Sequence, residues 1–388
     1  MFLTPGDPDD LRLGAAAILR QHYGAEATVA ARAPGRVNLI GEHVDYHRGP
    51  CLPLALEHAT HVALRPRDDD RVRLVSRHSD EPWEGTLDEC ASATGWAAYA
   101  AGVLWALRDS GRAVPGLDLA VDSTVPVGAG LSSSAALECA VGVAVASLVD
   151  PDLLTTGRRE LAQLCIRAER EVAGAPTGGL DQTVAMLAEA GAALLVDFDD
   201  DSTHQVPLDL TAEGLALLVT DTRVSHALVD GGYGARREDS EEAARRLGLE
   251  SLREARLGML DDLGDERLRR RARHVVTEIE RVAATVDALE SGDWTAVGGL
   301  LDASHASLRD DYEVSCAELD LATTTAREAG ALGARMVGGG FGGSAVALVP
   351  AERVEAVAAA VDTAFAAAGH RPPAHLRAVA SSGAALLG

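Results

Sequence analysis

The sequence contains no lysine, because all 35 of its cationic side chains are arginine. It therefore lacks the lysine of a P-loop and the lysine of a protein-kinase site. It also lacks the amine on which Schiff-base and pyridoxal-phosphate chemistry depends. A phosphate site in this chain must be built from backbone N–H groups, hydroxyl groups, arginine and a metal ion.

Aromatic residues are scarce, at 3% of the chain, so the core must be built from Leu, Val and Ala. So few rings disfavour a stacking platform for single-stranded nucleic acid. The 59 acidic and 35 basic residues give a net charge of −24, which repels phosphate backbones. We expect neither a nucleic acid nor a membrane as a partner.

The five cysteines are widely spaced, odd in number and form no C-x-x-C pair, so neither a zinc ribbon nor a disulfide framework is indicated. The first residues lack the basic and apolar regions of a secretory signal. No apolar run approaches the length of a membrane span. These features predict a reduced, soluble, cytoplasmic protein.

Extended and helical patterns alternate along the chain, which predicts an α+β fold with two lobes and a boundary near 200–215. An Asp- and Arg-rich segment, 258–273, is expected to form a solvated helix face and a loop. Ser315 and Glu318 have the spacing of a capping box at a helix start. The predicted strands are 27–34, 59–66, 70–76, 116–124, 191–198, 215–221, 334–337 and 344–349, and the predicted helices are 95–109, 131–148, 156–173, 234–256, 266–290, 315–329 and 351–368.

Two glycine-rich segments allow a backbone to approach a neighbour closely. Residues 126–136 place glycines and three serines between a strand and an apolar helix, whose N-terminus offers free N–H groups to an anion. The alternative is a plain turn with a serine N-cap. Residues 338–344 hold five glycines in six positions, which suit either a ligand or a tight crossing with another loop.

Two further segments concentrate polar side chains. Residues 33–46 carry Arg, Asn, Glu, His, Asp and Tyr, a density that suits the hydroxyls of a sugar. A polar surface loop is the alternative, although interleaved apolar residues indicate partial burial. Asp181 follows two glycines at a helix start, with Glu169 twelve positions upstream. Asp181 can be a first-turn or N-cap acid, a general base or a metal-bound carboxylate, and spacing does not decide among them.

Together the four segments resemble the GHMP family of small-molecule kinases and, within it, the galactokinases. The similarity to the galactokinase signature runs over 35–54, the other motifs follow in the family's order and spacing, and residues 312–320 also resemble a galactokinase segment. The resemblance implies a ribosomal-S5-domain-2-like N-terminal domain over 1–205 and a ferredoxin-like C-terminal domain over 206–388. The active site would lie in the cleft between them, and the last strand or helix would cross over.

The resemblance also implies ATP-dependent phosphorylation of the C1 hydroxyl of α-D-galactose, giving galactose 1-phosphate and ADP, by a monomer that uses Mg²⁺. Asp181 would face that hydroxyl as the base, with Arg36 beside it, and Ser134 and Glu169 would bind Mg²⁺. The implied sugar-binding residues are Glu42, His43, Val44, Asp45, Gly178 and Tyr233. The implied ATP-binding residues are Gly128, Ala129, Gly130, Leu131, Ser132, Ser133 and Ser134.

The sequence departs from the family pattern at several positions, so a kinase for N-acetylgalactosamine, L-arabinose or galacturonate is an alternative. A non-catalytic sensor of galactose and ATP is disfavoured, because such proteins lack part of the serine–alanine stretch that is intact here at 134–136, and because Asp181 and Arg36 are present. His226 can approach the sugar near Tyr233 or lie in a surface loop. The departures are Val44, His47, Thr177, Gly179, Ala317 and Val337.

Overall fold

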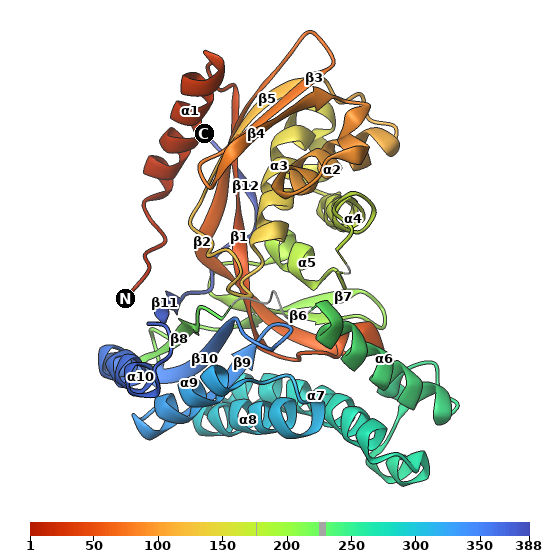
Figure 1. The fold of residues 1–388 in the computed structure, drawn as a ribbon, viewed down its shortest axis with the longest axis vertical. Coiled ribbons are helices and arrows are strands. Elements are labelled where there is room, and N and C mark those ends of the chain that lie inside the picture. The colour runs from red at the N-terminus through yellow and green to blue at the C-terminus, as the bar shows by residue number, and fades with distance from the viewer. Residues whose placement is uncertain (176, 225–229) are drawn as a thin grey trace.

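The structure is a computed structural model of the chain and describes residues 1–175, 177–224 and 230–388. Figure 1 shows two sheets, one above the other, with helices packed against both. The α+β prediction is confirmed.

The larger sheet has eight strands and forms the upper part of the molecule in Figure 1. Six strands lie in the order β12–β1–β2–β5–β3–β4, and β6 and β7 extend from β2. Neighbours are antiparallel, except that β3 and β5 are parallel. The strands are β1 (Val29–Ile40), β2 (Pro50–Pro66), β3 (Arg71–Ser76), β4 (Ser79–Thr86), β5 (Leu117–Ser123), β6 (Ala192–Asp197), β7 (Ser202–Pro207) and β12 (Ala385–Leu387).

The smaller sheet is wholly antiparallel, in the order β11–β8–β10–β9. In Figure 1 it lies below the larger sheet and above the helices of the lower layer. Its strands are β8 (Leu215–Asp221), β9 (Gly333–Val337), β10 (Ser344–Pro350) and β11 (Ala374–Ala378).

Helix α1 (Pro8–Tyr23) lies on one side of the larger sheet, and α2 to α5 lie on the other (Figure 1). Helix α3 is buried on all sides from Ala135 to Ala146, and Glu138 is the one charged residue in that span. The other helices are α2 (Trp96–Asp109), α3 (Ser133–Val149), α4 (Arg158–Ala168), α5 (Leu180–Leu187), α6 (Asp230–Arg246), α7 (Glu266–Ser291), α8 (Trp294–Ser307), α9 (Ala317–Glu328) and α10 (Val354–Ala368).

The two ends of the chain pair with opposite sheets. The backbone N–H of Leu3 donates to the carbonyl of His375 in β11, at 2.7 Å. At the other end, Leu387 in β12 pairs with Ala30 in β1. The smaller sheet therefore includes contacts from the start of the chain, and the larger sheet includes a strand from the end.

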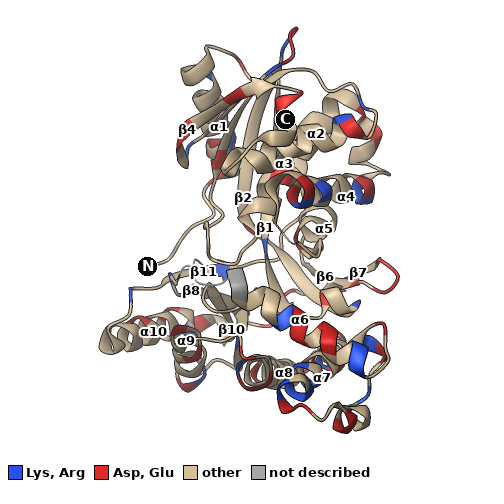
Figure 2. Cartoon of the chain, turned by 45° about the vertical axis from the view of Figure 1, so that its right-hand side comes forward, with Lys and Arg blue, Asp and Glu red and all other residues tan. Residues whose placement is uncertain are grey.

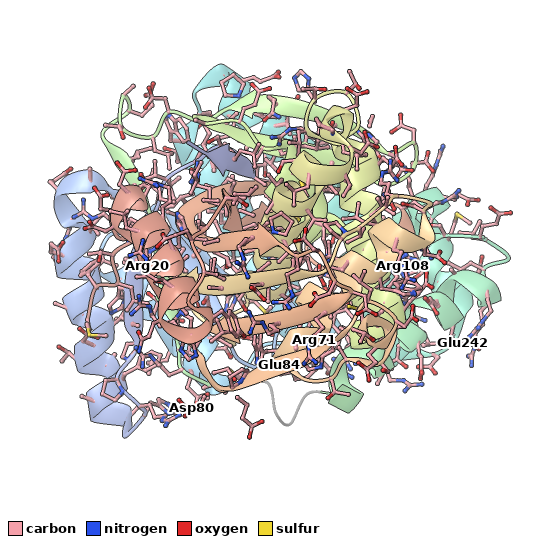
Figure 3. The ribbon with its side chains drawn as sticks, turned by 90° about the horizontal axis from the view of Figure 1, so that it is seen from above. Arg20, Arg71, Asp80, Glu84, Arg108 and Glu242 are labelled. Atoms are coloured by element: carbon pink, nitrogen blue, oxygen red, sulfur yellow. The ribbon has the colours of Figure 1, made fainter. Side chains whose placement is uncertain are left out.

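Charged side chains lie mainly on the outside. Figure 2 shows them concentrated on α4, α6 and α7, while α3 and the strands behind it are largely uncharged. In Figure 3, which shows the molecule from above, Glu242 and Asp80 lie near the edge of the molecule. Within the described residues, no helix combines the length and the apolar character needed to cross a bilayer.

Four expectations from the sequence need correction or comment. The predicted helix 234–256 is too long, because α6 ends at Arg246 and only a short 3-10 turn follows, at Leu252–Glu254. Ser315 does not form a capping box, because α9 begins after Cys316 and the Ser315 hydroxyl donates to Asp320 at 2.5 Å instead. The segment 258–273 is not wholly solvated: Arg271 is 1% exposed, since the carboxylate of Glu313 pairs with its guanidinium. The expected domain boundary at 205 falls inside β7, and the division of the chain there stays a prediction.

Helix α8 crosses β9 at very short range, and two adjacent glycines provide a test of this crossing. A Cβ on Gly298 would overlap the backbone carbonyl of Leu332, whereas Gly299 faces open space. We expect Gly298→Ala to lower the free energy of unfolding by about 1–3 kcal/mol through overpacking. Gly299→Ala should raise it by about 0.5–1 kcal/mol, because alanine favours the helix. Urea unfolding measures both changes, and equal effects at the two positions would contradict the crossing.

Candidate active site

The site begins at an irregularity in the pairing of β1 with β2, between Pro34 and Arg36. A Cβ on Gly35 would lie 2.7 Å from the carbonyl oxygen of Leu131, so glycine allows β1 to approach the 126–136 loop. The N–H of Arg36 donates to that carbonyl at 3.1 Å. The irregular strand thus aims Arg36 at the loop.

Arg36 links this loop to Asp181. One guanidinium nitrogen donates to the carbonyl of Gly130 at 2.6 Å, and the other lies 2.7 Å from Asp181 Oδ1. The second oxygen of Asp181 accepts a 2.5 Å hydrogen bond from the Ser132 hydroxyl. Asp181 lies in the first turn of α5, but Gly179 is the N-cap. The carboxylate therefore faces the site rather than capping its own helix.

The loop ends in left-handed backbone at Gly128, Gly130 and Ser132, directly before α3. Ser132 occupies the N-cap position, yet its side chain makes no capping hydrogen bond. The first turn of this 17-residue helix is thus available to an anion, as the sequence suggested. Ala129 and Leu131 are buried, which fixes the loop from behind.

The glycine-rich segment 338–344 packs against the same loop. A Cβ on Gly338 would lie 3.7 Å from the carbonyl oxygen of Gly130, and the Ser344 hydroxyl donates to the carbonyl of Ala129 at 2.7 Å. The N–H of Phe341 donates to the carbonyl of Val314. The segment therefore makes the tight crossing that was one of the two alternatives, and its Gly338 and Gly339 also line a cavity.

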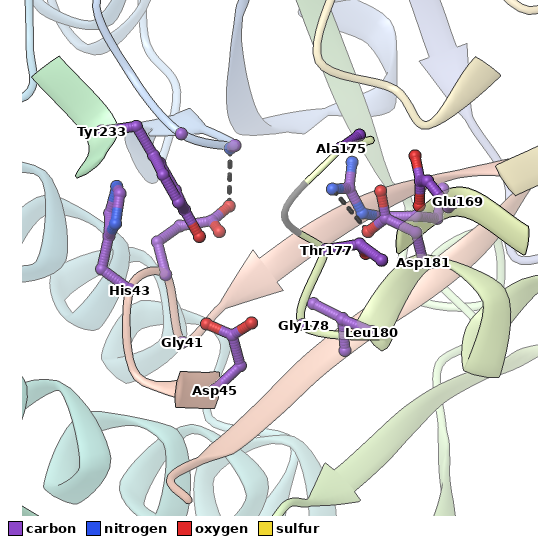
Figure 4. Close-up of a pocket in the computed structure, with 14 residues that line it drawn as sticks. Gly41, His43, Asp45, Glu169, Ala175, Thr177, Gly178, Leu180, Asp181 and Tyr233 are labelled. Atoms are coloured by element: carbon purple, nitrogen blue, oxygen red, sulfur yellow. Dashed lines mark hydrogen bonds and ion pairs between the residues drawn. The ribbon is translucent and has the colours of Figure 1, made fainter. Parts of the chain in front are cut away.

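A cavity of about 240 Å³ lies next to Arg36 and Asp181. In Figure 4, His43 and Tyr233 line one side, Asp181 and Glu169 line the opposite side, and Asp45 lies between them. The predicted site residues that line this one cavity are Arg36, Glu42, His43, Asp45, Glu169, Gly178, Asp181 and Tyr233.

Helix α7 holds the 41–45 turn from below. The N–H of Gly41 donates to Glu278 at 3.0 Å, and His274 Nε2 lies 3.0 Å from the carbonyl oxygen of Glu42. Both α7 side chains are fully buried. On the cavity side, Glu42 Oε1 accepts a 2.7 Å hydrogen bond from the N–H of Gly338. The turn is therefore fixed from two directions.

His43 is neutral in this environment. Burial, together with nearby His274, lowers the pKa of His43 to about 3. Its Nδ1 lies 3.0 Å from the Tyr46 hydroxyl, which lies 2.7 Å from the hydroxyl of Tyr312. Its Nε2 is buried and has no protein partner among the described residues. A bound hydroxyl group can supply that partner.

Asp45 combines burial with an acidic neighbourhood. Burial raises the pKa of Asp45 to about 6, and the carboxylates of Glu42 and Asp181 act in the same direction. A Cβ on Gly178 would overlap the Asp45 carboxylate. Glycine at this position therefore gives Asp45 its place in the cavity wall.

A second acidic group lies behind Asp181. Burial and the nearby Asp181 raise the pKa of Glu169, which lies in a π-helical turn after α4. The side-chain amide of Gln182 donates to Glu169 at 2.5 Å and to the fully buried Glu138 at 2.8 Å. Glu169 is thus fixed in orientation while its negative charge is poorly compensated by the protein.

A second cavity, of about 370 Å³, adjoins the start of α3. It is lined by Ser133, Ser134 and the aromatic rings of Trp96 and Tyr99. Val127, in the loop before α3, also lines it and is 78% exposed. A flat, partly apolar ligand bound here would lie beside the helix N-terminus.

Not every expected site residue lies at a cavity. The side chain of Val44 is fully buried in a core cluster with Cys51 and does not line the first cavity, because the turn directs it toward the protein interior. His226 lies outside the described residues.

The sequence interpretation missed several side chains that shape the site: Glu138, Trp96, Tyr99, His274, Glu278 and Arg335. Helical periodicity could have found only the α7 pair, since His274 and Glu278 are four residues apart and share a face. Arg335 lies inside a short strand, where nothing in the local pattern marks it as part of a site.

Family profiles match three parts of the chain. The profile described as the galactokinase galactose-binding signature matches residues 18–66, and those for the N-terminal and C-terminal domains of GHMP kinases match 98–189 and 285–367.

Full-length comparisons agree. The chain is 51% identical to a galactokinase of Streptomyces coelicolor over 375 residues, covering 94% of this chain and 96% of the relative. It is 45% identical to a galactokinase of Mycobacterium tuberculosis, covering 92% and 99%. A crystal structure of Lactococcus lactis galactokinase complexed with galactose superposes with a TM-score of 0.91 at 35% identity, covering 97% and 99%. The predicted two-domain GHMP fold is confirmed, and the chain belongs to the galactokinase family of GHMP kinases.

Proposed function

We propose that this chain transfers the γ-phosphoryl group of ATP to the C1 hydroxyl of α-D-galactose, giving galactose 1-phosphate and ADP. The observation that carries the proposal is the double contact of Arg36. It binds the backbone of the phosphate loop and the carboxylate of Asp181 at once. Phosphoryl transfer depends on positioning and charge compensation, and this contact joins the donor side to the acceptor side.

On the acceptor side, Asp181 orients the hydroxyl and takes up its proton as the O–P bond forms and the bond to ADP breaks. Arg36 lies beside the point of transfer and stabilises the negative charge that spreads over the phosphoryl oxygens. Ser132 and Arg36 hold the two oxygens of Asp181 in place before substrate binds, so little reorganisation is needed.

On the donor side, the N–H groups of residues 128–134 and the start of α3 bind the phosphates without a lysine. The second cavity accepts the nucleotide base, with Trp96 and Tyr99 as its aromatic wall. This assignment places the base and the phosphates on adjoining surfaces of one loop.

The proposed Mg²⁺ ligands are Ser134 and Glu169. Among the described residues, no group of three or more His, Cys, Asp or Glu side chains forms a metal cage. Mg²⁺ commonly uses one or two protein oxygens together with substrate phosphates, so a hydroxyl and a carboxylate suit it. Glu169 lies close enough to Asp181 for their charges to oppose each other, and a divalent cation would compensate both. When bound, the ion neutralises charge on the phosphates.

The first cavity suits a neutral monosaccharide. It is smaller than the pockets that hold drug-sized ligands, and it offers acceptors and donors on Glu42, His43, Asp45 and Tyr233. Carboxylates outnumber cationic groups on its walls, which disfavours a uronic acid such as galacturonate. We therefore propose galactose ahead of the other sugars considered.

We also propose that the protein acts as a cytoplasmic monomer with no nucleic-acid or membrane partner. Its five cysteines are all free thiols, which supports a reducing compartment. The acidic net charge of −24 opposes binding to phosphate backbones.

Turnover of a sugar panel tests the proposed function. Coupled ADP release should give the highest kcat/KM with galactose, and lower values with N-acetylgalactosamine, L-arabinose and galacturonate. A higher kcat/KM with another sugar would replace the substrate assignment. Binding of galactose and ATP without ADP release would favour a sensor.

Asp181→Ala tests the acceptor-side assignment. We expect kcat to fall by about 10²–10⁴-fold, the usual contribution of a positioned proton acceptor, while the affinity for galactose changes little. Asp118→Asn is a suitable control, because Asp118 is also a buried carboxylate paired with arginines but lies on β5, outside both cavities. Near-normal turnover of Asp181→Ala would refute the assignment.

Asp45→Asn tests the electrostatic cost of the sugar site. Because the pKa of Asp45 is raised to about 6, its protonated form stabilises the fold fully below about pH 4, and this stabilisation is lost as the pH rises through 6. We expect the variant to be more stable than the parent by about 1–3 kcal/mol at pH 7.5 and nearly equal to it at pH 4. Thermal unfolding at both pH values measures this, and a variant less stable than the parent at pH 7.5 would contradict it.

Trp96→Ala tests the nucleotide-base cavity. Loss of base stacking should raise the KM for ATP by about tenfold and leave the KM for galactose unchanged. Trp105→Ala is the matched control, since Trp105 lies on the same helix and packs against Arg167 instead of lining that cavity. Equal changes in the two variants would argue against the assignment.

A further inference from the structure

Arg335 is one of the largest fully buried side chains of the protein. It lies in β9 of the smaller sheet and reaches the larger sheet, where its Nη1 donates to the backbone carbonyls of Asn38 at 3.1 Å and Leu39 at 2.9 Å. Both carbonyls belong to the second irregularity of β1, between Asn38 and Ile40. A buried guanidinium needs compensating partners, and two carbonyl groups do not neutralise its charge.

Two carboxylates contribute to that compensation: Glu42, which forms an ion pair with Arg335, and the buried Glu278, whose pKa the nearby Arg335 helps to lower. Arg335 Nη2 lies 3.3 Å from Glu42 Oε1, the same oxygen that accepts the N–H of Gly338. Both contacts come from one stretch of the smaller sheet and the turn after it. Glu42 Oε2 receives no hydrogen bond from the described residues, and Glu42 lines the cavity while being only 7% exposed.

We propose that Arg335 is a specificity-determining positioning residue of the sugar site. It holds Oε1 of Glu42 and thereby presents Oε2 as the acceptor for one particular sugar hydroxyl. Arg335 does not touch the sugar and acts through Glu42. This inference rests on the proposed function, because it assumes that the first cavity binds the sugar.

Arginine is needed for this arrangement because of its shape. Its planar fork contacts two β1 carbonyls with one nitrogen and faces Glu42 with the other. A lysine ammonium is a single point charge on a flexible stem and cannot serve both sides in one fixed geometry. Arg335→Lys therefore keeps the charge but weakens the ion pair that, together with the N–H of Gly338, fixes the orientation of Glu42.

The test uses galactose and its monodeoxy derivatives, each lacking one hydroxyl, with the full-length enzyme. One derivative should show the same KM with Glu42→Gln as with the parent enzyme. The hydroxyl that this derivative lacks is the one that donates a hydrogen bond to Glu42. Arg335→Lys should raise the KM for galactose about tenfold or more, as expected for a hydrogen bond to a charged group. It should leave the KM for that one derivative and the KM for ATP unchanged. Calorimetric binding of galactose should show the same pattern without turnover.

Arg271→Lys is the matched control. Arg271 is equally buried, donates to the backbone carbonyl of Asp311 and pairs with Glu313, but it does not line the cavity. Arg271→Lys should be less stable than the parent enzyme, but its KM values should vary across the derivatives as those of the parent do. If Arg335→Lys behaves like this control, Arg335 is merely structural and the inference is overturned.

A double substitution tests whether Arg335 acts through Glu42. Glu42→Gln/Arg335→Met removes both charges of the pair, so neither is left buried and unpaired. We expect its KM for galactose to equal that of Glu42→Gln alone, and additive effects would overturn the inference. If the parent enzyme does not phosphorylate galactose, the proposed function fails. The parent enzyme can phosphorylate galactose while the KM changes of these variants are additive or are the same for every derivative. In that case only the proposed role of Arg335 fails.

Discussion

The ion pair between Arg36 and Asp181 is the interaction on which the site depends. It forms because an irregularity in β1 turns Arg36 away from the ordinary strand pairing and toward the phosphate loop. A glycine is required there, since a side chain would strike the loop. The same guanidinium then fixes the loop through Gly130 and the acid through Asp181. One charge thus determines the relative position of the surfaces proposed to bind donor and acceptor.

The shifted pKa values in the site arise because several carboxylates lie close together around the Arg36 guanidinium. Glu42, Asp45, Glu169 and Asp181 line one small cavity. Burial and the neighbouring carboxylates raise the pKa of Asp45 and of Glu169, so a cation or hydroxyl donors are favoured as ligands because they would compensate the negative charge. The site is destabilising by itself, which is common where a protein must bind polar ligands. The apolar helix α3 and the surrounding aliphatic core supply the stability that the cavity lacks.

Many of the strands, helices and turns were predictable, because each depends mainly on the residue types within its own segment. The strand at 215–221 and the glycine-rich turn before α3 follow from residue type and spacing, and the structure has them as predicted. The convergence of Arg36, Asp181 and the 41–45 turn required the resemblance to a family, since their separation in sequence says nothing about distance. The capping box failed because Ser315 found a partner in Asp320 instead of the helix backbone. Arg335 was unpredictable, as its role depends on a strand and a turn that meet only in the folded protein.

The exchange of chain ends between the two sheets affects how the protein can fold. Residues near the start complete the smaller sheet, and β12 covers β1 in the larger one. During synthesis, the edge of β1 that pairs with β12 stays unpaired until residues some 350 positions later have been made. Strand pairings over such separations form slowly. Until then the open edge is a surface to which another chain could add a strand. The two lobes are consequently coupled in assembly, since each is completed by residues from the opposite end of the sequence.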